Sequence, residues 1–79
     1  MKAVNFEIVV DKRNQVISVT MNGYNLNPEA FGRFESLSDL IRFIAKFIYG
    51  KKVSDYFIKN NLNVWIQKGR KSTKLFIEN

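Results

Sequence analysis

The first stretch of the chain alternates apolar and polar residues, which is the pattern of a strand with one buried face. The apolar positions are Val4, Phe6, Ile8 and Val10. Successive side chains of a strand point to opposite faces, so this period of two predicts a strand whose apolar side chains face the core.

A second β-branched run follows a short polar segment and covers residues 16–21. Ile17, Val19 and Met21 alternate there with Ser18 and Thr20. Two alternating runs joined by a short polar segment predict a β-hairpin. Asn22-Gly23 is expected to end the second strand, because this dipeptide tolerates positive φ.

The residues from 24 to about 36 are interpreted as a linker that contains one short helical turn. Asn27, Pro28 and Glu29 follow the order of an N-cap, a first-turn proline and a first-turn acid. Phe31 and Phe34 are expected to anchor the linker to the core.

A helix over residues 37–49 is the clearest predicted element. Its apolar residues fall within one stripe at helical spacing: Leu37, Leu40, Ile41, Ile44, Phe47 and Ile48. Ser36 and Asp39 resemble a capping box, and Gly50 stands where a left-handed C-terminal cap is expected. One face of the helix should therefore pack against the core, while the opposite face, with Arg42 and Lys46, is exposed to solvent.

The remaining residues predict a short second helix and a second hairpin. The helix fits residues 55–61 with Ser54 as its cap, and two strands follow around residues 62–67 and 73–77. The order β-β-α-(short α)-β-β predicts an α+β fold, with a four-stranded, mostly antiparallel sheet and one principal helix packed on one face. We expect a single compact domain over residues 1–79, with the strand order left open.

Composition excludes much familiar catalysis. The chain has neither cysteine nor histidine, so thiol nucleophiles, thiolate metal sites and the commonest general base are all missing. Its acidic residues are scattered singly, and its glycines are too far apart for a phosphate-binding loop. We therefore expect a small non-enzymatic binding protein with no cofactor and no metal site.

Charge is distributed unevenly along the chain, whose net charge is +6. Residues 1–41 carry four basic and five acidic residues, whereas residues 42–79 carry nine basic and two acidic ones. Such an asymmetry favours an anionic partner, although it also serves solubility. The longest apolar stretch is interrupted by Arg42 and Lys46, and no signal-peptide pattern opens the chain, so a cytoplasmic protein with no membrane partner is expected.

The last hairpin is the candidate binding site. If its apolar alternates face the helix, two aromatic rings and a lysine face the other way, beside a basic turn. The residues concerned are Trp65, Phe76, Lys68, Arg70, Lys71 and Lys74. Aromatic rings stack bases and cations meet phosphates, so this pattern favours nucleic-acid binding, similar in principle to the stacking platforms of RNA-binding sheets.

Three alternatives remain open at this point. Trp65 and Phe76 would have a purely structural role if they were cross-strand partners or were covered by the linker with Phe31 and Phe34. The same face would also suit an acidic protein partner or a homodimer, including an adaptor or inhibitor from a phage or other mobile element. In a helix-turn-helix interpretation, the helix over residues 55–61 would present Tyr56, Lys59 and Asn60 to the major groove of DNA.

Overall fold

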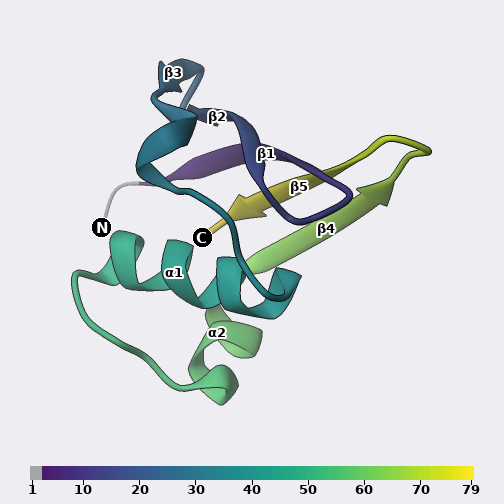
Figure 1. Cartoon of the computed structure of the whole chain (residues 1–79). Helices are drawn as coiled ribbons and strands as arrows, with labels where there is room; N and C mark the ends of the chain where they lie inside the picture. The colour runs from purple at the N-terminus through teal and green to yellow at the C-terminus, as the bar shows by residue number, and fades with distance from the viewer. Residues whose placement is uncertain (1–2) are drawn as a thin grey trace.

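A computed structural model describes residues 3–79 and has both helices on one face of a sheet (Figure 1). In chain order the elements are β1 (Asn5–Asp11), β2 (Val16–Met21), β3 (Tyr24–Leu26), the 3-10 turn η1 (Pro28–Ala30), α1 (Leu37–Tyr49), α2 (Asp55–Asn61), β4 (Asn63–Lys68) and β5 (Ser72–Glu78). Neighbouring strands are antiparallel and follow the order β3-β2-β1-β5-β4. The central strand is therefore β1.

The predicted α+β class and antiparallel pairing are confirmed, but the sheet has five strands where four were predicted. The additional strand is β3, which follows directly from the Asn22-Gly23 turn. Asn22 has φ 51° and Gly23 has φ 86°, and two consecutive left-handed residues make the tight turn of a two-residue hairpin. Met21 then pairs with Tyr24, so the dipeptide turns the chain into another strand and does not merely end β2.

The predicted alternation in β2 is wrong at Ile17. Val9 of β1 pairs with Ser18 while Val10 pairs with Val16, which leaves Ile17 as the extra residue of a β-bulge. A bulge shifts the alternation by one position. Val16 is therefore buried, whereas Ile17 is 50% exposed.

The predicted bounds of α1, its Ser36 N-cap and its Gly50 C-cap are confirmed, but the Asp39 carboxylate, the other half of the predicted capping box, accepts a hydrogen bond from Arg42. Ser36 Oγ accepts a hydrogen bond from the Asp39 N–H at 3.1 Å. At the other end Gly50 adopts φ 71° and its N–H donates to the Lys46 carbonyl. Each cap satisfies backbone groups that have no partner inside the helix, so the helix begins and ends where these residues stand.

Short local signals also place the other helical segments correctly. Ser54 Oγ accepts from the Phe57 N–H at 3.1 Å and starts α2, and the Asn27 side chain caps η1. The predicted anchoring of the linker is confirmed as well: Phe31 and Phe34 are partly buried against the core, and both rings contact Phe43 of α1.

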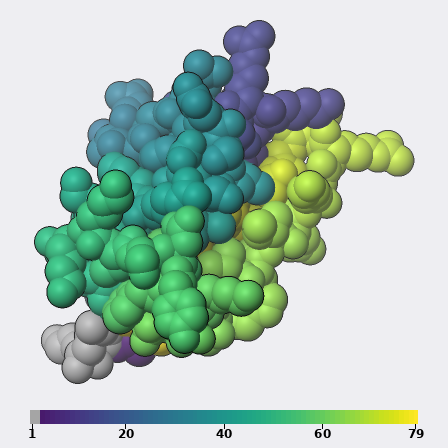
Figure 2. All heavy atoms as spheres, turned by 90° about the horizontal axis from the view of Figure 1, so that it is seen from below, coloured from purple at the N-terminus to yellow at the C-terminus, as the bar shows by residue number. Residues whose placement is uncertain are grey.

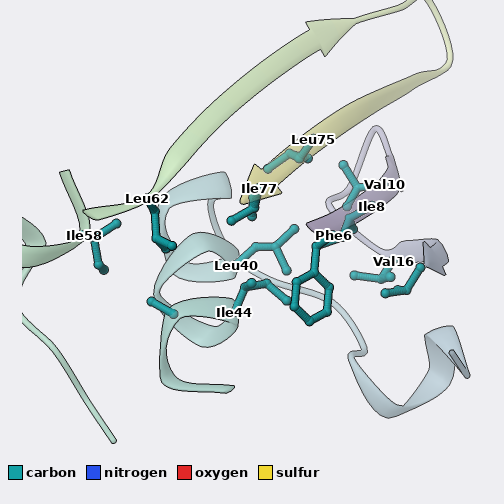
Figure 3. Close-up of a cluster of buried hydrophobic side chains, with 12 residues drawn as sticks. Phe6, Ile8, Val10, Val16, Leu40, Ile44, Ile58, Leu62, Leu75 and Ile77 are labelled. Atoms are coloured by element: carbon teal, nitrogen blue, oxygen red, sulfur yellow. The ribbon is translucent and has the colours of Figure 1, made fainter. Parts of the chain in front are cut away.

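The core lies between the sheet and the helices (Figure 3). Its buried side chains are Phe6, Ile8, Val10, Val16, Val19, Leu40, Ile44, Ala45, Ile58, Leu62, Leu75 and Ile77. Phe47, which was predicted in the buried stripe, lies at its margin and is 54% exposed, with its ring edge-on to Phe6. Because both helices cover the same face, the opposite face of the sheet, called the open face below, is left to solvent.

Candidate functional site

A row of side chains crosses the open face over four strands. Trp65 in β4 lies opposite Phe76 in β5, Phe76 lies opposite Glu7 in β1, and Glu7 lies opposite Thr20 in β2. The chain neighbours of Phe76 and Glu7 are buried in the core, and side chains alternate along a strand. The row therefore points away from the helices, as the hairpin pattern predicts for Trp65 and Phe76.

Trp65 is the most accessible ring of this row. It is 54% exposed, while Phe76 is half-buried beside it. The linker does not cover the pair, because Phe31 and Phe34 contact Phe43 on the helix side. Trp65 can therefore be reached from solvent, although its pairing with Phe76 also supports the hairpin.

Lys74 shares the open face, but its ammonium group is already engaged. Its Nζ lies 3.0 Å from Oε1 of Glu7 and 5.7 Å from the centroid of the Phe76 ring. Both charged side chains are well exposed, and exposed ion pairs of this kind are weak. A phosphate could thus compete with Glu7 for Lys74.

The rings border a hollow of about 260 Å³ that also contains two carboxylates. Glu7 and Glu78 line it together with Trp65 and Phe76. Sequence reasoning missed both acids as part of the site. The alternation placed Glu7 on the outer face of its strand, but only the pairing of β1 with β5 brings it beside Phe76.

Two basic turns lie side by side at one end of the sheet. Asp11 pairs with Ser72, so the turn after β1 adjoins the turn before β5, and both views agree on this (Figures 1 and 2). The cations gathered here are Lys12 and Arg13 from the first turn and Lys68, Arg70 and Lys71 from around the second. The basic residues of this end do not all come from the second half of the sequence, because the fold brings Lys12 and Arg13 of the first half beside them.

The neighbouring linker adds a further cation to this basic end. The backbone of Arg33 pairs with that of Gln15 in an isolated antiparallel β-bridge, immediately after the first turn. The carboxylate of Asp11, the last residue of β1, is used locally: its Oδ1 accepts hydrogen bonds from the N–H groups of Arg13 and Gln15. Asp11 therefore shapes the turn that presents Lys12 and Arg13.

Lys68 differs from the other candidate residues in its orientation. It pairs with Thr73 and continues the side of β4 that carries Val64 and Ile66, so it faces away from the open face. Ile66, predicted to pack against the helix, is 46% exposed. The reason is visible in Figure 1, where the β4–β5 hairpin extends beyond α1.

The three residues of the helix-turn-helix hypothesis differ in how free their side chains are. Tyr56 and Lys59 are exposed on α2, but the Asn60 amide donates to the Tyr56 carbonyl of its own helix at 2.7 Å. Ile58 is buried, so this seven-residue helix is also part of the core.

Within residues 3–79, no three acidic, histidine or cysteine side chains gather closely enough to hold a metal ion. None of the helices in this described range has the length and apolar character needed to cross a membrane. Comparisons of the chain with protein-family models, with curated proteins and with solved structures found no match.

Proposed function

We propose that the protein binds single-stranded nucleic acid across the open face of its sheet. One observation carries this proposal: the exposed Trp65 and its partner Phe76 share a sheet with two adjoining basic turns. Bases stack on aromatic rings while cations meet the phosphates. A single strand is favoured over a duplex, because the bases of a duplex are stacked on one another and cannot reach Trp65.

The spacing suits a short segment of nucleic acid. Trp65 lies three positions before the end of β4 at Lys68, which corresponds to roughly 10 Å at the rise of a strand, and the turn with Arg70 follows directly. A few extended nucleotides could bridge the rings and the turns. Glu78 lies two positions beyond Phe76 on the side away from the turns, so its repulsion of phosphates would direct the backbone towards the basic end.

The chain contains a single tryptophan, so intrinsic fluorescence reports directly on Trp65. Short single-stranded DNA and RNA oligonucleotides should quench this fluorescence at low salt. The logarithm of the affinity should then fall linearly with the logarithm of the salt concentration, because phosphate contacts release counterions. Absence of both quenching and a change in oligonucleotide anisotropy at low salt would overturn the proposal.

A second candidate function is a protein interface on the same face, including a homodimer. The exposure of Trp65 beside Phe76 supports it, because aromatic side chains left to solvent form an apolar surface. Sedimentation analysis separates the two functions. A dimer that persists at high salt and shields Trp65 from a soluble quencher would favour the protein interface.

A further inference from the structure

The outer side of the helices carries a second group of aromatic side chains, remote from the open face. Phe43 is 40% exposed on α1, and Phe47 one turn later is more exposed still. Tyr56 and Phe57 on α2 are exposed as well. Large apolar side chains that gather at a surface mark interaction sites more often than single exposed ones do.

Two hollows on this side adjoin and form what we call the helix groove. The larger, of about 700 Å³, lies between the linker, α1 and the loop to α2, with Phe34, Phe43 and Val53 in its lining. The smaller, of about 380 Å³, lies over Phe47 and Gly50. Phe43 and Lys46 line both. Figure 2 views the molecule from this side, where the teal and green atoms of α1, the loop and α2 gather.

The apolar floor of the groove is held in place by ring contacts. The Phe43 ring meets those of Phe31 and Phe34 at centroid distances of 5.7 and 5.4 Å, and the Phe47 ring meets Phe6 at 5.7 Å. Rings fixed in this way lose little freedom when a ligand binds, which favours affinity.

The charges of the groove are unbalanced. Its carboxylates, Asp39 and Asp55, are both held by Arg42, each at 2.9 Å. Lys46 and Lys52 line the groove and have no ion pair among the residues that the structure describes, and the same holds for Lys51 beside them. Three cations (Arg42, Lys46 and Lys52) against two carboxylates give the lining a net charge of +1, and Lys51 beside it raises this to +2, which is complementary to an acidic ligand.

We propose that the helix groove docks an acidic, amphipathic segment of a partner protein. Apolar side chains of the segment would lie on Phe43 and Phe47, and its carboxylates would meet Lys46, Lys51 and Lys52. An amphipathic helix in an apolar groove is a common mode of peptide recognition. A protein is favoured over nucleic acid here, because the polar groups that could read base edges, Arg42 and its two aspartates, already bind one another.

The test uses a designed peptide and the whole protein labelled with ¹⁵N. The peptide, of about 18 residues or five helical turns, carries leucine at helical spacing and glutamate elsewhere. A matched peptide has lysine in place of every glutamate. We expect the acidic peptide alone to produce saturable shifts at the amides of Phe43, Lys46 and Gly50, with no change at Trp65.

Charge reversal supplies the matched variants. Lys46→Glu combined with Lys52→Glu should weaken the acidic peptide by about tenfold or more, while Lys68→Glu at the far end of the sheet should leave its affinity unchanged. All three lysines are exposed, so we expect the variants to fold as the unmodified protein does.

Several results would overturn the proposal: no saturable binding of the acidic peptide, equal binding of the lysine peptide, or shifts centred on the open face. It would equally fail if an oligonucleotide perturbed the groove amides, or if self-association of the protein alone did so. Because the groove and the open face are separate surfaces, loss of peptide binding leaves the Trp65 fluorescence titration unaffected.

Discussion

Arg42 in α1 holds the carboxylate of Asp55 at the start of α2 through two hydrogen bonds, from Nε to Oδ1 at 2.9 Å and from Nη2 to Oδ2 at 3.1 Å. Its Nη1 also reaches Asp39, three residues earlier in α1. The paired geometry between guanidinium and carboxylate is directional. Arg42 therefore links the two helices across the loop that follows Gly50.

We expect this link to weaken in acid. The hydrogen bond from Arg42 lowers the pKa of Asp55 below its usual value of 3.8, and this outweighs the opposing effect of burial. A carboxyl with a lowered folded pKa contributes stability above its unfolded pKa and loses it as the pH falls through the folded value. Asp55→Asn should thus reduce the unfolding free energy near neutral pH but not at a pH below the folded pKa. Urea denaturation at both pH values measures this, and an equal loss at both would contradict it.

Ile44→Ala should destabilise the fold by about 2–5 kcal/mol, because Ile44 is fully buried at the centre of the packed face of α1. Ile66→Ala provides the matched control, since it removes the same atoms from a side chain that is nearly half exposed. Chemical denaturation should show a loss of under about 1 kcal/mol for that control. Similar losses for the two variants would mean that the packing face of α1 is misassigned.

Gly50→Ala should cost about 1–2 kcal/mol, because Gly50 has a left-handed φ that a Cβ atom disfavours. A Cβ built there meets nothing within 4 Å, so the penalty is conformational and not steric crowding. Gly50→Asn should cost less, since asparagine adopts this conformation more readily. Thermal melting of both variants gives the comparison, and an equal penalty would argue against the left-handed cap.

Trp65→Ala should weaken oligonucleotide binding by about 1–3 kcal/mol with little change in salt dependence, because stacking does not involve counterions. The variant has no tryptophan, so the anisotropy of a labelled oligonucleotide replaces fluorescence quenching. Thermal melting must show that the hairpin survives, since Trp65 also pairs with Phe76. Unchanged affinity in a folded variant would remove Trp65 from the proposed site.

Lys71→Gln and Arg13→Gln should each reduce the magnitude of the salt slope by about 0.7–0.9 for a lost phosphate contact. Arg13 is the sharper test, because only the pairing of Asp11 with Ser72 brings its turn to the basic end. Lys59→Gln on α2 is the matched control and should leave the slope unchanged. A slope that responds to Lys71 and not to Arg13 would show that the two turns do not act together.

Much of the fold could be predicted because its signals are local. Ser36, Gly50 and Ser54 act on backbone groups within one helical turn, so their neighbours suffice to locate α1 and α2. Ile17 was misplaced, because a bulge depends on the partner strand and leaves no trace in the alternation. β3 was missed although Asn22-Gly23 is a hairpin signal, because the three residues after it are too few for a pattern of their own.

The candidate site was only partly predictable, since some of the residues around the hairpin come from segments distant in the sequence. The alternation alone put Trp65 and Phe76 on one face. By contrast, the ion pair between Glu7 and Lys74 and the approach of Arg13 to the second turn both follow from the pairing of β1 with β5. Strand order was open at the sequence level, so no local pattern could supply these contacts.

The central position of β1 has a consequence for the order in which the chain folds. Its second neighbour is β5, which places Phe6 opposite Ile77, so one edge of β1 has no partner until β5 has been synthesised. Closing so long a loop costs entropy before any contact is gained, and folds rich in distant contacts form slowly. On the ribosome, β1 and β2 would wait as a hairpin with an unpaired edge and an uncovered apolar face, a state prone to aggregation. Chains interrupted before β5 should therefore be the ones that chaperones retain.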